Sequence, residues 1–257
     1  SAGNLKVEAV EDSIGKQDLS FEYNHLYQLA KEKESEKEKH SYSYDSLGNR
    51  TGKDGEKNSH NIHNALVHSK DEKRDYDKNG NLIKVQQADK SYSLSYDSLD
   101  RLSSLVCEGK WKKSFVYDAF NRRLYEESFS YNATDETWIS KGKEYFLFFG
   151  QREMGSFNQS NSLKSFRSLD PSHDSEIGAA VGIELEGKAY IPFYDHRGSV
   201  AALCDPKTSE LKEAYKYDAY GQETVFDASG KELSHSALNN PWRFSSKSYI
   251  LLNKFEK

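Results

Sequence analysis

The amino-acid sequence predicts an all-β protein, made of successive β-hairpins that form a curved antiparallel sheet. Three observations lead to this prediction. A Tyr-Asp dipeptide recurs along the chain at intervals of about 21 residues. The segments before it alternate between apolar and polar residues, as half-buried strands do. Aromatic residues, which favour strands, make up 13% of the 257 residues, and the chain has a single methionine.

The Tyr-Asp dipeptide marks an internal repeat. Counted from Tyr23, which Asn24 follows in a degenerate first copy, the intervals between its tyrosines are 21, 32, 20, 21, 77 and 23 residues. Four of these six intervals lie between 20 and 23, which indicates a repeat unit interrupted by insertions. The full copies are Tyr44-Asp45, Tyr76-Asp77, Tyr96-Asp97, Tyr117-Asp118, Tyr194-Asp195 and Tyr217-Asp218.

Each copy is predicted to be a strand, a turn and a second strand. In "SYSLSYD", Tyr92, Leu94 and Tyr96 share one face and serines occupy the other. Aspartate at the first position caps a type I turn through its side chain, and a residue in the left-handed conformation then closes a bulged hairpin. The residue types that best tolerate this conformation stand four places after each tyrosine. They are Gly48, Gly80, Asp100, Asn121, Gly198 and Gly221.

The next strands are predicted to start at Leu82, Leu102 and Val200. The degenerate first copy is expected to lack the turn, because Tyr27 occupies its left-handed position.

Three segments depart from the repeat, and the longest is Asn132–Gly187. The charge run Lys31–Lys39 is predicted to be a solvated hairpin tip or a short exposed segment, and Lys53–Asn64 is interpreted as an insertion that accounts for the interval of 32. Lys143–Gly150 is strongly apolar and is predicted to form a strand, which "QREMGSF" follows. The polar stretch Asn158–Ser175 is predicted to be a loop.

The composition limits the class of protein. The net charge of −5 is mixed in sign, and its lysine-rich stretches are interleaved with glutamate, which does not indicate a nucleic-acid partner. No apolar run is long enough for a membrane span, and no signal peptide is visible. Two cysteines, Cys107 and Cys204, are too few for a disulfide framework and are expected to be free thiols.

Ordered motifs occupy the C-terminal third of the chain. "YDHRGSVAALCD" (194–205), "YKYDAYGQE" (215–223) and "NPWRFSSKSY" (240–249) follow one another, and "KEYFLFFGQREMGSF" (143–157) precedes them. With the Tyr-Asp repeat, this order resembles the Rhs/YD-repeat family, which includes bacterial Rhs proteins, Tc toxin complexes and animal teneurins. The three motifs follow one another as in the Rhs repeat-associated core, and "KEYFLFFGQREMGSF" resembles the strand pair that introduces that core.

The resemblance implies a fold and a division of the chain. The hairpins would form a segment of a spiral β-shell. Residues 1–131 would be YD-repeat hairpins, 132–187 an apolar strand pair with a polar loop insertion, and 188–257 a C-terminally incomplete repeat-associated core. In bacterial members an Asp-Pro-rich motif supplies a self-cleavage site. Asp170-Pro171 and Asp205-Pro206 do not stand in the matching context, and the chain runs on as "ILLNKFEK".

Some residues could suggest chemistry. Asp195, His196 and Ser199 resemble the members of a hydrolytic triad, but Asp195 already has a turn role and a triad needs convergent side chains. We therefore expect no catalytic residues.

Two clusters could suggest a metal site. His60, His63 and His68 lie within nine residues, yet neither cysteine nor paired carboxylates accompany them. The stretch "LDPSHDSE" (169–176), with Asp170, His173, Asp174 and Glu176, lacks the spacing of a calcium loop. We expect no metal and no cofactor.

The function expected from the resemblance is structural and non-catalytic. The chain would be a shell segment of a secreted or cell-surface protein, which encapsulates or presents a C-terminal toxin. Self-association through sheet edges is a further expectation. The alternative is a module that binds carbohydrate or a cell-surface partner through exposed aromatic rings, although the regular parity of the tyrosines favours aromatic ladders within the sheet.

Overall fold

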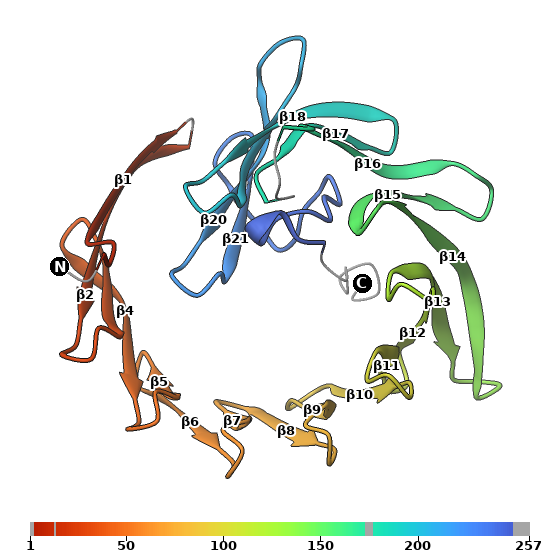
Figure 1. Cartoon of the computed structure of the whole chain (residues 1–257), viewed down its shortest axis with the longest axis horizontal. Coiled ribbons are helices and arrows are strands. Elements are labelled where there is room, and N and C mark those ends of the chain that lie inside the picture. Colours follow the sequence, from red (N-terminus) through yellow and green to blue (C-terminus); the bar gives the residue numbers. More distant parts are fainter. Residues whose placement is uncertain (1–2, 13, 173–176, 249–257) are drawn as a thin grey trace. The chain divides into compact units, whose positions relative to one another are not determined.

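The protein is built almost entirely from β-strands. The computed structural model describes residues 3–12, 14–172 and 177–248, and these form 22 strands and one 3₁₀ turn (Figure 1). The predicted all-β fold of successive antiparallel hairpins is confirmed. Contacts divide the chain into two compact units, Ser1–Glu108 and Gly109–Lys257. Within the described residues, no helix is long and apolar enough to cross a membrane.

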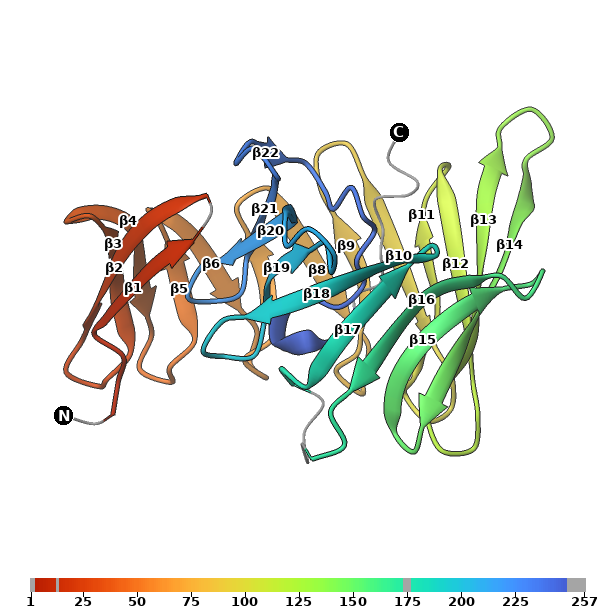
Figure 2. The same ribbon diagram turned by 90° about the horizontal axis from the view of Figure 1, so that it is seen from above.

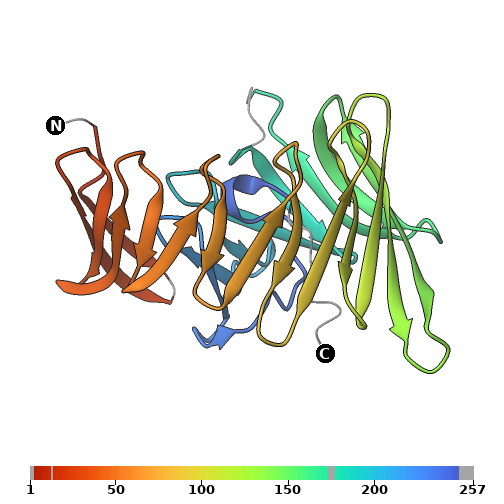
Figure 3. The same ribbon diagram turned by 90° about the horizontal axis from the view of Figure 1, so that it is seen from below.

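The first unit is a meander in which each strand pairs with the next in antiparallel fashion. Its strands are β1 (Val7–Asp12), β2 (Gly15–Tyr23), β3 (Leu29–Glu34), β4 (Lys37–Tyr44), β5 (Arg50–Lys53), β6 (Glu56–His60), β7 (Leu66–Ser69), β8 (Glu72–Tyr76), β9 (Leu82–Gln86), β10 (Ser91–Tyr96) and β11 (Leu102–Cys107). Consecutive turns alternate between the two ends of these strands (Figure 3), so the Tyr-Asp turns of this unit all lie at one end.

The second unit continues the same pattern, again with every strand paired to the next (Figure 2). Its elements are β12 (Trp111–Tyr117), β13 (Arg123–Asn132), β14 (Thr137–Phe149), β15 (Arg152–Asn158), β16 (Leu163–Leu169), β17 (Ala180–Leu185), β18 (Lys188–Tyr194), β19 (Val200–Cys204), β20 (Leu211–Tyr217), β21 (Glu223–Asp227), β22 (Glu232–Leu233) and the 3₁₀ turn Phe244–Ser246.

A β-bulge accompanies the repeat tyrosine in every Tyr-Asp copy except Tyr217, where the register is regular. On β12, Trp111, Lys113 and Phe115 are buried in alternation, and the register then shifts between Val116 and Tyr117. Matching shifts occur at Tyr44, Tyr76, Tyr96 and Tyr194. The left-handed residue of the turn causes this extra residue on one strand, as the sequence predicts for a bulged hairpin. The strands that start at Leu82, Leu102 and Val200 also agree with the prediction.

The charge run contains a hairpin tip and the apolar stretch is part of a strand, as the sequence predicts. Lys31–Lys39 is the hairpin of β3 and β4, with cross-strand ion pairs from Lys31 to Glu38 and from Lys39 to Glu34. One member differs from the exposed tip that the sequence predicts: Glu32 is buried, and the Tyr42 hydroxyl donates to it at 3.4 Å. The apolar stretch lies in β14, which pairs with β15.

The interpretation of Lys53–Asn64 as a plain insertion is wrong. Asp54 and Gly55 form a tight turn between β5 and β6, and a second turn at residues 61–64 joins β6 to β7. The interval of 32 residues therefore contains two short hairpin units. His60 stands midway, 16 residues after Tyr44 and 16 before Tyr76.

The predicted loop Asn158–Ser175 is also corrected. Its middle, Leu163–Leu169, is strand β16, which pairs with β15 and β17. The residues of this strand that point into the unit include Ser165 and Arg167, which are both buried. Because buried polar residues replace apolar ones at these positions, the usual alternation is missing from the sequence.

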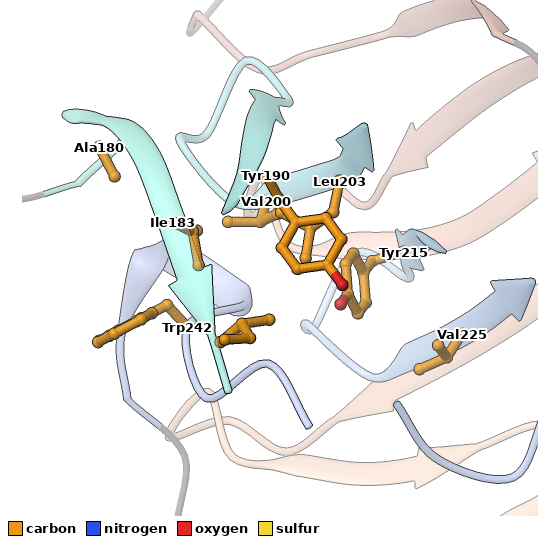
Figure 4. Close-up of a cluster of buried hydrophobic side chains, with 9 residues drawn as sticks. Ala180, Ile183, Tyr190, Val200, Leu203, Tyr215, Val225 and Trp242 are labelled. Carbon is orange, nitrogen blue, oxygen red and sulfur yellow. The ribbon is translucent and has the colours of Figure 1, made fainter. Parts of the chain in front are cut away.

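The hydrophobic core of the second unit lies between β17–β21 and the C-terminal residues (Figure 4). Val200 and Leu203 are fully buried, and Trp242 is 1% exposed. The core residues are Ala180, Ile183, Leu185, Tyr190, Val200, Leu203, Tyr215, Val225 and Trp242. Strands β17 to β21 supply all of these residues except Trp242. Trp242 follows the last strand in the sequence and completes the core.

Candidate functional site

The repeated turn is the recurring polar site of the molecule. At its first clear copy, Asp45 Oδ1 accepts backbone N–H groups from Leu47 and Asn49, both at 2.9 Å. The Gly48 amide donates to the Asp45 carbonyl at 3.1 Å, and Gly48 has φ of 85°. One aspartate thus caps the turn, and the left-handed residue closes it.

The same geometry occurs at every copy identified in the sequence. The aspartate accepts the amides two and four residues ahead, at Asp77, Asp97, Asp118, Asp195 and Asp218. The left-handed residue has positive φ at Gly80, Asp100, Asn121, Gly198 and Gly221. Tyr117, Asp118 and Asn121 therefore occupy turn positions like those of the other copies.

Four further turns share this bonding but lack the Tyr-Asp dipeptide. The capping residues are Asn24, Asn61, Asn158 and Asp227. The left-handed residues are Tyr27, Asn64, Asn161 and Gly230. Asparagine replaces aspartate at three of them, because either side chain presents the oxygen that accepts the turn amides.

The expectation that the turn fails at Tyr27 is wrong. Tyr27 has φ of 62°, and the Asn24 side-chain oxygen accepts the amides of Leu26 and Gln28. The hydrogen bonds of the turn outweigh the strain of a left-handed tyrosine, whose ring is 65% exposed and meets no crowding.

The repeat tyrosines tie neighbouring hairpins together. The Tyr96 hydroxyl donates to the Leu82 carbonyl at 2.9 Å, and Leu82 stands two residues after the left-handed Gly80. The carbonyl acceptor stands two residues after a left-handed position in the other pairs as well: Tyr23 to Leu5, Tyr44 to Leu29, Tyr76 to Leu66, Tyr194 to Ala180 and Tyr217 to Val200. Each tyrosine thus reaches back to the start of the strand that precedes its own.

Side chains also link adjacent turns. Asn49 donates through Nδ2 to Asp45 Oδ2 at 2.9 Å and to Asn64 Oδ1 of the next turn at 3.0 Å. Asn81 repeats this arrangement with Asp100, at 2.8 Å. An asparagine or aspartate at the left-handed position of one turn therefore accepts a hydrogen bond from the asparagine of the turn before it. Glycine at that position has no side chain to accept this bond.

Hydrogen bonds shift the acidity of the capping carboxyls. The side-chain hydrogen bond from Asn49 lowers the pKa of Asp45, and that from Asn81 lowers the pKa of Asp77. Desolvation raises the pKa of Asp118, but bonds from Arg122 and Phe120 outweigh it, so this pKa is lowered too. These three turns therefore favour the charged form of their capping aspartates.

The C-terminal segment, residues 236–248, packs on strands of the second unit. Asn240 Nδ2 donates to the Trp242 carbonyl at 2.7 Å, and Asn240 Oδ1 accepts the Trp242 amide at 3.1 Å. Arg243 pairs with Glu223 of β21. The Arg167 guanidinium donates to the Ser246 carbonyl at 2.9 Å.

This segment also packs on the turn at Asp195. The Ser245 amide donates to Ser199 Oγ at 3.0 Å, and Ser246 Oγ donates to the Gly198 carbonyl at 2.7 Å. A Cβ atom on Gly198 would lie 2.5 Å from Ile177 Cγ2, so glycine is required there for space as well as for its φ of 73°.

A charged cavity of about 70 Å³ lies in the second unit. Glu126 pairs with Lys113 of β12 and with Arg123 of β13, and all three are largely removed from solvent. Glu153 faces Arg123 and Ser248. The remaining wall includes Glu144 and the hydrogen-bonded serines Ser156 and Ser165. Each buried charge faces an opposite charge or a hydrogen-bonding partner, which is the arrangement of a structural network.

Two of the three residues that resemble a hydrolytic triad have structural roles. Ser199 is fully buried, and its Oγ accepts the Ser245 amide. Asp195 Oδ1 accepts two backbone amides of its own turn, and Arg197 donates to Oδ2 at 3.4 Å.

Of the residues considered for metal binding, His60, His63, His68 and Asp170 lie in the described part of the chain. His60 ends β6, His63 lies in the following turn and His68 is on β7. Among the described residues, no group of three or more histidine, cysteine, aspartate or glutamate side chains could hold a metal ion. His173, Asp174 and Glu176 lie outside the described residues.

Neither cysteine takes part in a disulfide. Cys107 is buried and Cys204 is half-buried. Burial raises the pKa of the Cys204 thiol, which favours its neutral form.

The sequence pattern missed four turns and the buried polar network. A search for Asp or Asn followed three residues later by Gly, Asn or Asp would have found Asn61, Asn158 and Asp227. The pairings of Arg167, Glu213 and Glu223 with the C-terminal segment carry no local signal, because their partners lie far away in the sequence.

Comparisons with known proteins find similar sequences, and no family model matches. The chain is 28% identical over 236 residues to a tRNA nuclease WapA of Bacillus subtilis strain 168. The aligned region covers 88% of this chain and 9% of that protein. It is also 28% identical over 198 residues to a tRNA(Glu)-specific nuclease WapA of Bacillus subtilis subsp. natto. This second aligned region covers 74% of this chain and 7% of that protein. The chain thus spans under a tenth of these relatives.

Solved structures show a partial likeness. A TcdB2-TccC3 crystal structure matches 95% of this chain and 16% of its own, with 14% identity and a TM-score of 0.48. A Photorhabdus luminescens Tc holotoxin pore with a TccC3 substitution matches 90% of this chain and 14% of its own, with 14% identity and a TM-score of 0.44. The chain is thus similar in sequence to two WapA proteins of Bacillus subtilis and is partly similar in structure to Tc toxin components.

Proposed function

We propose that this chain is a non-catalytic, wall-forming segment of a longer YD-repeat protein that carries a toxin. The repeated turn supports this proposal best. Its aspartates, left-handed residues and tyrosines all bond to backbone or to neighbouring turns, so they stabilise hairpins and present no reactive group. The polar groups of the repeat are committed to structure.

The similarity to proteins named tRNA nucleases supports a toxin context. The matched region is 9% of the WapA chain from strain 168, so the nuclease chemistry and this segment can reside in different parts of one protein. In our proposal the wall encloses or presents a C-terminal toxin, and the full-length protein is secreted or displayed at the cell surface.

The absence of catalysis can be tested directly. The purified 257-residue chain should leave tRNA intact and should not turn over general hydrolase substrates. If the wild-type chain cleaves tRNA and the Ser199→Ala or Glu153→Gln substitution abolishes that cleavage, the proposal is contradicted. Circular dichroism of both variants would separate a lost activity from a lost fold.

The enclosing role is tested in the full-length protein. Loosening the wall with Gly221→Val should make the toxin region more sensitive to protease, while Gly182→Ala should not. Gly182 has open space around its Cα position and does not need positive φ, which makes it a matched control. Equal sensitivity of both variants and the wild type would contradict an enclosing wall.

A further inference from the structure

The C-terminal segment is held on the second unit largely through buried carboxyl groups. Glu213 of β20 is 1% exposed, and its Oε2 accepts the Ser236 hydroxyl at 3.0 Å and the Leu238 amide at 3.1 Å. The Ser236 oxygen in turn accepts the Asn240 amide at 3.1 Å. One carboxyl group therefore fixes the start of the segment.

The other oxygen of Glu213 is buried without a hydrogen bond. Among the described residues, Oε1 of Glu213 is a buried polar atom that makes no hydrogen bond of normal geometry, and the Tyr215 hydroxyl that faces Glu213 lowers the pKa of this carboxyl less than burial raises it. No lysine or arginine lies within ion-pair distance of Glu213 in the described part of the chain. A charged carboxylate is costly in this setting, whereas a protonated carboxyl is much less so.

Two more carboxyls face the same segment. Glu223 of β21 pairs with Arg243, and its Oε2 is buried without a hydrogen bond among the described residues. Glu153 of β15 faces Ser248 and lies 3.4 Å from Arg123. These two have cationic partners, so Glu213 is the least compensated of the three.

We propose that the C-terminal segment is a pH-dependent latch, which binds the second unit more tightly as the pH falls from neutral to mildly acidic and in which Glu213 is the principal proton acceptor. Docking encloses Glu213 away from water, and undocking exposes it. The proton therefore favours the docked state. The latch goes beyond the wall-forming function and does not depend on it.

The surrounding charges determine the direction of the effect. Glu213 faces Arg243 of the segment, Tyr215 of its own strand and Tyr190 of β18. Arg123 and Arg167 face Glu153, and Arg243 faces Glu223. Desolvation is the largest influence at all three carboxyls, and it raises the pKa of Glu213, Glu223 and Glu153 above the ordinary glutamate range.

A raised pKa fixes the sign of the pH dependence. The docked state binds the proton more tightly than the undocked state, in which water reaches the carboxyl. The added stability is fully present below the ordinary glutamate pKa of about 4.3, and it is lost as the pH rises through the raised value. For one proton taken up, the docking equilibrium changes by up to about tenfold per pH unit in this window.

Hydrogen exchange of the whole chain tests the latch. The amides of Asn240 and Trp242 are hydrogen-bonded within the segment and report its docking. Their protection factors, corrected for the intrinsic pH dependence of exchange, should fall as the pH rises from 5 to 8. Protection in β10 of the first unit serves as the internal reference.

Two variants assign the effect to Glu213. Glu213→Gln mimics the neutral carboxyl and should keep the segment protected with a flattened pH profile. Glu210→Gln removes an exposed carboxyl close by, which pairs with Lys212, and should leave the profile unchanged. A flat profile in the wild type, or an unaltered slope in Glu213→Gln, would overturn the proposal.

Infrared spectroscopy keeps the proposal testable if Glu213→Gln does not fold. A carbonyl band of a protonated carboxyl should persist in the wild type above the ordinary glutamate pKa of about 4.3 and weaken as the pH rises further. A band that is already lost as the pH passes the ordinary glutamate pKa would overturn the latch, whatever the outcome of the tRNA assay.

Discussion

At the residue scale, one polar side chain organises each turn. An aspartate or asparagine oxygen accepts two backbone amides, and a left-handed residue lets the chain return into the next strand. A hydrogen bond of this kind contributes about 1 kcal/mol net, and an unsatisfied partner would cost more. The repetition of this small gain stabilises hairpins that contain few aliphatic residues.

Gly221→Val should destabilise the second unit by more than about 1 kcal/mol, because a β-branched residue is strained at φ of 81°. Its Cβ would also lie 2.9 Å from the Phe244 ring. Urea unfolding measures the change. Gly182→Ala should be close to neutral, and equal loss in both variants would contradict this account of the turn.

Tyr217→Phe should lower the free energy of unfolding by about 0.5 to 1.5 kcal/mol, because it removes the hydroxyl that donates to the Val200 carbonyl at 2.8 Å. Tyr131→Phe is the matched control, since Tyr131 contributes a ring contact to Trp138. Thermal or urea unfolding should show a larger loss of stability in Tyr217→Phe than in Tyr131→Phe. Equal losses in the two variants would contradict the tethering role of Tyr217.

At the element scale, the hairpin is predictable where its signal is local. The turn of Asp97, with its left-handed Asp100 and the strand from Leu102, can be read from the sequence because every cue lies within six residues. Asn61 escaped prediction because asparagine replaces aspartate and His60 replaces tyrosine. Strand β16 escaped because its buried positions are Ser165 and Arg167, whose partners lie on other strands and in the C-terminal segment.

Trp242→Ala should destabilise the second unit by about 3 to 5 kcal/mol, the range found for buried large-to-small changes. Trp242 is 1% exposed and completes the core, and Arg167 lies over its ring at 5.1 Å. Trp138→Ala removes a half-buried ring on β14 and should cost less. Calorimetry or urea unfolding can compare them, and a smaller effect at Trp242 would contradict its place in the core.

At the scale of the whole molecule, the same meander forms two compact units. The Tyr-Asp repeat and the alternation of apolar and polar residues predicted the all-β class, but the number of turns became clear only from their hydrogen bonds. The region boundaries at residues 131 and 187 remain predictions. What the sequence could not supply is the polar network of the second unit, because it joins residues more than 70 positions apart, such as Arg167 and Ser246.

The second unit should fold without the first. A fragment of residues 109–257 contains its own core and all strand pairs from β12 to β22. It should give a β-rich circular dichroism spectrum and a cooperative urea transition. A fragment that remains unfolded under conditions in which the whole chain is folded would contradict the division into two units.

The central claim is that one turn, used with and without its Tyr-Asp dipeptide, builds the molecule. Hydrogen exchange of the amides four residues after each capping residue tests it most directly. The account predicts protection at Ala65 and Ser162, in the turns of Asn61 and Asn158, as well as at Asn81 and Arg101 in the Tyr-Asp turns. Exchange of Ala65 and Ser162 at the rate of an unstructured loop, while Asn81 and Arg101 stay protected, would contradict it.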